Sequence, residues 1–130
     1  MKKIILSLAA LSMLAACHES LEDRCAREVK EYTEKKCPAM IAETVRIDSL
    51  GFDKDTHTVH YYYTLLGKAD NAQVVAKSNP RKALIQEVKN ATSMETFKEA
   101  GYNFSYTYWS ENHKGLKLFE TTINKKDYAK

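Results

Sequence analysis

The chain has 130 residues, with 20 lysines and arginines against 17 aspartates and glutamates, which gives a formal net charge of +3 at pH 7. A chain of this length can form one domain with a modest hydrophobic core. Lysine and glutamate are intermixed along it, and no basic block of the kind that lines a nucleic-acid groove is present. Composition therefore argues against nucleic acid as a partner.

The first sixteen residues have the three parts of a secretion signal. Lys2 and Lys3 supply the positive charge, and residues 4–14 are apolar except for two serines. This apolar run is far shorter than the roughly 20 residues that a membrane-spanning helix needs. Two alanines complete the cleavage pattern, so the sequence predicts a signal peptide over residues 1–16.

The end of this segment, Leu14-Ala15-Ala16-Cys17, resembles the lipobox of bacterial lipoproteins. The resemblance implies a diacylglycerol thioether on Cys17, cleavage before it and an acylated amino terminus. Several acyl chains, at about 0.8 kcal/mol per buried methylene, hold a protein firmly at a membrane. Ordinary secretion, with a cysteine at this position by chance, is the alternative.

The residue after this cysteine is His18, not the aspartate that marks inner-membrane retention in lipoproteins of double-membraned bacteria. The resemblance therefore implies a protein anchored in the outer membrane and facing the periplasm, or in the cell membrane of a single-membraned host. Residues 17–19 are expected to form the lipid anchor and a short tether. Residues 20–130 are expected to form one domain close to the membrane.

A helix is predicted over residues 20–36 at the start of this domain. Ser20 can cap the helix, and Pro38 ends it. The predicted buried face has apolar residues at spacings of four, four and three. They are Leu21, Cys25, Val29 and Tyr32.

The rest of the chain reads as two hairpins separated by helices. Strands over residues 41–50 and 56–66 flank the turn residues 51–55. A polar connection precedes a helix that starts at Asn79-Pro80 and a short one that starts at Thr92. Alternation then predicts strands over 102–109 and 116–123, followed by a polar tail.

This order, αββαββ, predicts a two-layer α+β domain: a four-stranded antiparallel sheet with helices on one face. In general appearance the mature domain is similar to small uncharacterised envelope lipoproteins of Gram-negative bacteria. That similarity rests on the run from Lys36-Cys37-Pro38 to the closing Thr-Thr-Ile-Asn-Lys-Lys-Asp-Tyr. It implies no activity.

Two cysteines remain in the mature domain, Cys25 and Cys37. An oxidising compartment favours a disulfide between them. One straight helix through both would place their Cα atoms about 18 Å apart, whereas a disulfide needs about 4.4–6.8 Å. We therefore expect two unlinked thiols with Cys25 buried. A helix that stops near Tyr32 would allow the bond.

Six of the eight tyrosines lie in the second and third predicted strands. Aromatic side chains favour pleated surfaces, so most of them are expected in the core. Tyr62 and Trp109 fall on the face opposite to the main apolar set of their strands. Because tyrosine and tryptophan are favoured at interfaces, these two residues form the candidate interaction surface.

Asp53, Asp55, His57 and His60 bring carboxylates and imidazoles together at short spacing, which could ligate a metal. His57 and His60 are three residues apart on a strand and so point to opposite faces, while the aspartates suit a turn. No zinc, phosphate-loop or nucleophile motif occurs. We therefore predict no metal, no cofactor and no catalytic residues.

The leading hypothesis is a lipid-anchored envelope protein that acts without catalysis by binding another envelope macromolecule, expected to be a protein. A small-ligand or glycan-binding lipoprotein that uses the aromatic strands is the first alternative. A hydrolase with an unrecognised site is the second.

Overall fold

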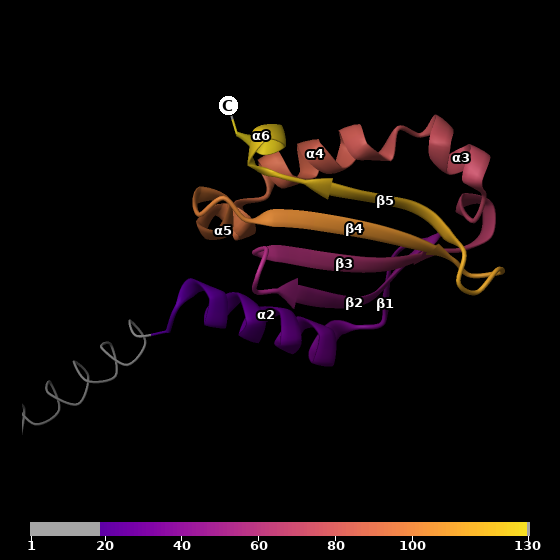
Figure 1. Ribbon diagram of the computed structural model, residues 1–130. Helices are drawn as coiled ribbons and strands as arrows, with labels where there is room; N and C mark the ends of the chain where they lie inside the picture. The colour runs from indigo at the N-terminus through magenta and orange to yellow at the C-terminus, as the bar shows by residue number, and fades with distance from the viewer. Residues whose placement is uncertain (1–18, 130) are drawn as a thin grey trace, which may run out of the picture.

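The computed structural model describes residues 19–129. The predicted signal peptide over residues 1–16 and the predicted lipidation at Cys17 lie outside the described residues. In chain order the elements are α2 (Leu21–Lys36), β1 (Ala39–Ala42), β2 (Val45–Asp53), β3 (Thr58–Leu65), η1 (Gly67–Ala69), α3 (Ala72–Lys77), α4 (Pro80–Asn90), η2 (Thr92–Met94), α5 (Glu95–Glu99), β4 (Asn103–Ser110), β5 (Lys117–Ile123) and α6 (Lys125–Tyr128) (Figure 1).

The strands form one sheet in the order β1-β2-β3-β4-β5. Neighbours are antiparallel except β3 and β4, which run parallel from the Thr58–Asn103 pair to the Leu65–Ser110 pair. The α+β class is confirmed, but the sheet is five-stranded and mixed where a four-stranded antiparallel sheet was expected. The helical segment between β3 and β4 returns the chain to the end of the sheet where β3 began, so β4 runs in the same direction.

The additional strand, β1, takes up the beginning of the segment predicted as one strand over residues 41–50. The chain turns at Glu43 and Thr44, so that Ala42 pairs with Val45 and β1 lies antiparallel to β2. A two-residue turn is enough to join antiparallel neighbours. As a result β1 becomes an edge of the sheet.

Helix α2 begins where Ser20 Oγ accepts a hydrogen bond from the backbone N–H of Asp23 at 3.0 Å, as the predicted cap requires. Its apolar stripe faces the sheet, and Cys25 is only 1% exposed. Near its C-terminal end, Thr33 Oγ1 accepts from Leu50 N–H at 2.9 Å and lies 3.2 Å from Leu50 O. These contacts hold α2 along β2.

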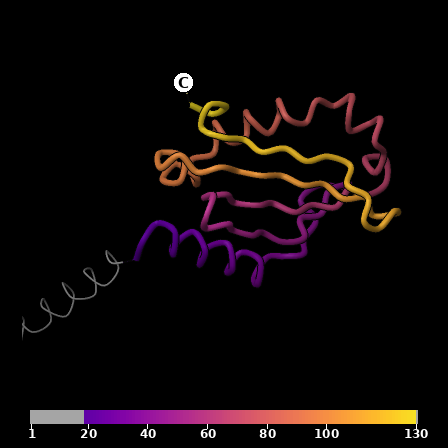
Figure 2. Tube along the Cα trace, in the orientation of Figure 1, coloured from indigo at the N-terminus to yellow at the C-terminus, as the bar shows by residue number. Residues whose placement is uncertain are grey.

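Helices α2, α4 and α5 bury their apolar residues against the same face of the sheet. In Figure 1, α2 lies along β2 and α4 along β5, and the same arrangement is visible in the trace of Figure 2. The strands β3 and β4 therefore lie between the two long helices. The strand residues buried in this core are Ile47, Val59, Tyr63, Phe104, Tyr106 and Ile123.

Two short helices, α3 and α6, occur where polar segments were expected. Asn71 caps α3 by accepting from the N–H groups of Gln73 and Val74, and Asn124 forms a capping box at α6. Tyr128 packs α6 against the core, and its hydroxyl donates to Tyr102 O at 2.8 Å and to Lys98 O at 3.2 Å. The C-terminal segment is thereby part of the domain.

Candidate functional site

The opposite face of the sheet carries Tyr62 and Trp109. Tyr62 pairs with Thr107 in the β3–β4 register, and Trp109 pairs with Thr64. Both aromatic side chains are half-buried, and the buried residues of α2, α4 and α5 all belong to the core on the other side. Within residues 19–129 this surface is therefore a helix-free face of the sheet.

Tyr62 lies over a glycine of the neighbouring strand. A Cβ atom built on Gly51 would meet Tyr62 Cε2 at 3.5 Å, so the ring covers backbone that has no side chain of its own. The imidazole of His60 stacks on the same ring with centroids 5.8 Å apart and planes at 7°. His60 and Tyr62 thus form a flat aromatic patch.

Trp109 marks the other end of this face and lies among charged groups. Lys117 Nζ lies 5.6 Å from the centre of the indole ring and 3.0 Å from Glu120 Oε1. Thr107 Oγ1 donates to Glu120 Oε2 at 3.1 Å. The hydrogen bond from Lys117, and after it the one from Thr107, lower the pKa of Glu120. The face therefore carries aromatic rings beside the ionised pair of Lys117 and Glu120.

A shallow hollow of about 570 Å³ adjoins Trp109. Arg46 borders it and forms ion pairs with Asp48 at 2.8 Å and Glu111 at 3.0 Å. Arginine, tryptophan and tyrosine are the residues most enriched at the energetic centres of protein interfaces. The helix-free face therefore has the composition of a protein-binding surface.

A second concave site lies on the core side, between α2 and the sheet. It is a mostly apolar pocket of about 390 Å³, within the range of roughly 300–1,000 Å³ of small-molecule sites. We call it the α2 pocket. Its lining residues come from α2, the strands β1 to β4, η2 and α5, and include Cys25, Tyr32, Ile41, Tyr61, Tyr63 and Phe97.

Two tyrosines of this pocket, Tyr61 and Tyr63, belong to a stacked ladder across β3 and β4. Tyr61 stacks on Tyr106 with ring centroids 4.8 Å apart, and Tyr63 stacks on Tyr108 at 4.9 Å. Burial raises the pKa of each of these phenols, to about 12 for Tyr108. The ladder is therefore uncharged at neutral pH, and its ring faces are covered by one another.

Both cysteines of the domain are free thiols in the structure. Cys25 lines the α2 pocket, and burial raises the pKa of its thiol to about 12. Burial also raises the pKa of Cys37. Because the thiolate is the nucleophilic form, neither environment activates a cysteine.

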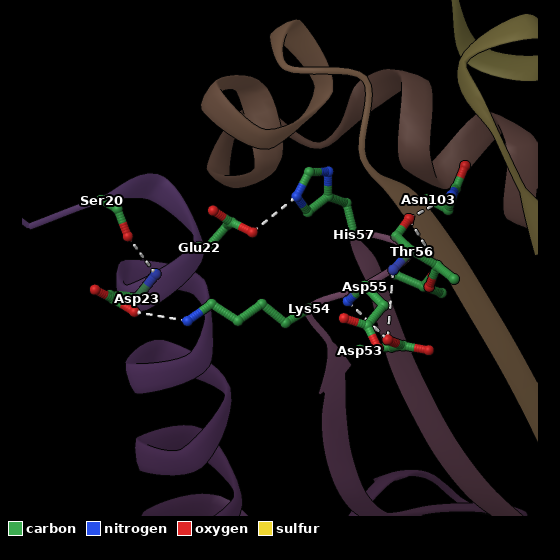
Figure 3. Close-up of polar contacts among 10 residues, drawn as sticks. Ser20, Glu22, Asp23, Asp53, Lys54, Asp55, Thr56, His57 and Asn103 are labelled. Atoms are coloured by element: carbon green, nitrogen blue, oxygen red, sulfur yellow. Dashed lines mark hydrogen bonds and ion pairs between the residues drawn. The ribbon is translucent and has the colours of Figure 1, made fainter.

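Three of the four residues considered as metal ligands, Asp53, Asp55 and His57, lie around the β2–β3 turn (Figure 3), whereas His60 stacks on Tyr62. Asp53 Oδ1 accepts from the backbone N–H of Asp55 at 3.0 Å. His57 Nε2 lies 3.0 Å from Glu22 Oε2, and the imidazole stacks on Tyr102. Residues 19–129 contain no group of three or more His, Cys, Asp or Glu side chains placed to hold a metal ion.

The contact between His57 and Glu22 was not foreseen from the sequence, because 35 positions separate the two residues. Together with the ion pair between Lys54 and Asp23 at 3.3 Å, it ties the β2–β3 turn to the start of α2 (Figure 3). The Lys54–Asp23 pair is largely exposed and the His57–Glu22 pair is partly exposed, so each is worth little by itself.

Residues 20–119 match DUF8479, described as a domain of unknown function. The chain belongs to the DUF8479 family. In this member, the matched region includes Tyr62, Trp109 and the whole lining of the α2 pocket. No curated protein sequence matches the chain.

The DUF8479 fold of this chain is similar to a solved structure from Pseudomonas aeruginosa, a protein described as a presumed secreted protein. The TM-score is 0.65 at 11% identity, and the match covers 84% of this chain and 97% of the other. At that identity the likeness concerns the fold alone. Within residues 19–129 of this DUF8479 member, none of the helices is both long enough and apolar enough to cross a membrane.

Proposed function

We propose that this DUF8479 protein is anchored by lipid on Cys17 to the outer membrane and acts without catalysis by binding another envelope protein. The observation that carries the proposal is the helix-free face, which bears the half-buried Tyr62 and Trp109, the latter beside the Lys117–Glu120 ion pair. Aromatic anchors within a polar rim are typical of protein interfaces. The description of the P. aeruginosa protein as presumed secreted is compatible with export of this chain.

Anchoring at Cys17 would keep the domain near the bilayer. Leu21, the first residue of α2, is four positions after Cys17, and an extended chain spans at most about 3.6 Å per residue. The start of α2 would then lie within about 14 Å of the anchor. Such a short tether restricts the partner to molecules at or near the membrane.

In-cell photo-crosslinking tests this function. A photoreactive amino acid is placed at Tyr62 or Trp109, and at Gln86 as the matched control, because Gln86 is exposed on α4 away from the helix-free face. We expect a discrete protein adduct from positions 62 and 109 and none from position 86.

A second comparison concerns the anchor. The adduct should disappear when Cys17→Ser releases the chain from the membrane, although the variant remains folded. Folded and lipidated protein that yields no adduct from either aromatic position would overturn the proposal. An adduct of equal strength from Gln86 would show that the captured protein is not specific to the helix-free face.

A further inference from the structure

The α2 pocket has an apolar end and a tyrosine end. Near the start of α2 its walls are the most deeply buried apolar groups, among them Cys25, Val59 and Phe104. Toward the end of α2 the lining changes to Tyr32 and Tyr63, with Ile41 of β1 beside them. Because α2 and β3 run in the same direction, this polarity follows the long axis of the pocket.

The dimensions of the pocket suit a chain-like ligand. Val59 and Tyr63 are four residues apart on β3, which corresponds to about 13 Å along a strand. The volume of about 390 Å³ is too small for a folded segment of a partner and is within the range of small-molecule sites. Ile41 is 55% exposed, so the tyrosine end lies next to solvent.

One polar group that lines this pocket lacks a protein partner. The Tyr63 side chain is 8% exposed, and its hydroxyl makes no hydrogen bond to any residue between 19 and 129. The described residues hold no fully buried side-chain oxygen or nitrogen without a partner, so this hydroxyl is open to the space around it. The Tyr63 ring is stacked between Tyr106 and Tyr108 with centroids 6.4 and 4.9 Å away. Since the hydroxyl is at the outer tip of a ring that stands on the sheet, it faces the helix layer and the pocket.

Two other tyrosine hydroxyls around the core have partners. Tyr128 Oη is bonded to backbone carbonyls, and Tyr61 Oη lies 4.0 Å from Met94 Sδ. The hydroxyls of Tyr102 and Tyr106 have none among residues 19–129, but unlike Tyr63 these two residues do not line the pocket. Tyr63 is therefore a donor available to a ligand.

The lining offers no unpaired charge to an ionic ligand. Glu28 is the one charged residue of the lining, and Arg24 already pairs with it at 3.1 Å. Lys36 lies over the Tyr32 ring, 5.8 Å from its centre, but is not part of the lining. The remaining lining residues are apolar or uncharged, so an uncharged ligand suits the pocket better than a charged one.

We propose that the α2 pocket binds an uncharged amphiphile with a single apolar chain, of the class of fatty alcohols and acyl esters. The chain lies along α2 toward Cys25 and Phe97, and the polar oxygen of the ligand accepts a hydrogen bond from Tyr63 Oη. This site is on the opposite side of the sheet from Tyr62 and Trp109. It therefore does not depend on the proposed protein partner or on the lipid anchor.

Titration calorimetry with 1-decanol tests the proposal. The protein is the full chain with Cys17→Ser, purified without detergent so that nothing competes for the pocket. We expect saturable binding of one molecule per chain, and weaker binding of decanoate, which has the same chain length and a negative charge. Tyr63→Phe removes the donor without changing the ring, so decanol should bind it about two- to tenfold more weakly.

A matched pair of variants locates the site. Ser93 is exposed and lines the pocket, so Ser93→Trp should obstruct it and abolish binding without disturbing the core. Thr92→Trp places the same bulk on the adjacent exposed residue outside the lining and should bind normally. The proposal is overturned by no saturable binding, by undiminished binding to Ser93→Trp or Tyr63→Phe, or by tighter binding of decanoate than of decanol.

Discussion

The hydroxyl group of Tyr128 should stabilise the fold, whereas that of Tyr63 should not, although both tyrosines are 8% exposed. Tyr128 Oη lies 2.8 Å from Tyr102 O and 3.2 Å from Lys98 O. Tyr128→Phe removes this donor and leaves a buried carbonyl oxygen without it, at a cost of about 1–3 kcal/mol. For a domain of this size, roughly 4 °C is lost per kcal/mol, so Tm should fall by about 4–12 °C.

Tyr63→Phe is the matched control, because it deletes the same atom at the same degree of burial from a hydroxyl with no partner among residues 19–129. Its free energy of unfolding should stay within about 0.5 kcal/mol of that of the unsubstituted protein, or rise. Thermal unfolding followed by circular dichroism measures both variants under identical conditions. Equal losses from the two substitutions would refute the assignment of a partnered hydroxyl to Tyr128 and a free one to Tyr63.

Three further predictions concern the caps, acid and the thiols. Ser20→Ala removes the acceptor for Asp23 N–H and should cost about 0.5–2 kcal/mol in urea unfolding. The backbone hydrogen bond from Asn124 lowers the pKa of Asp127 below its ordinary value of 3.8. The Asp127 carboxylate therefore stabilises the fold at neutral pH, and this contribution is lost as the pH falls through the lowered pKa. The Asp127→Asn variant should accordingly lose less stability in acid than the unsubstituted protein does. Cys25 should resist alkylation in the native protein, and both Cys25 and Cys37 should react after denaturation without reductant, as mass spectrometry would show; failure of the denatured chain to react would mean that the thiols are oxidised.

Local patterns were enough to predict the longer elements of the fold. Spacings of four, four and three from Leu21 to Tyr32 predicted α2, and the alternation of aromatic and polar residues predicted β3 and β4. These patterns work because side chains recur every 3.6 residues on a helix and every second residue on a strand. The same reasoning correctly assigned the chain to the α+β class.

The short helix from Thr92 was predicted, but β1, α3 and α6 were missed because their own residues do not specify them. β1 has four residues and exists because it pairs with β2 across the turn at Glu43 and Thr44. α6 is a single turn that owes its position to the capping box at Asn124 and to the buried hydroxyl of Tyr128. Elements of this length are stabilised by tertiary contacts rather than by their own periodicity.

By itself, the sequence determined the α+β class, the cap and buried face of α2, and the alternation that places Tyr62 and Tyr63 on opposite sides of one strand. Only the tertiary structure decided that β3 and β4 run parallel, that His57 meets Glu22, and that a pocket remains between α2 and the tyrosine ladder. The physical reason is that periodicity reports which side of an element faces inward, whereas strand order, long-range partners and unfilled space depend on how separate elements pack together.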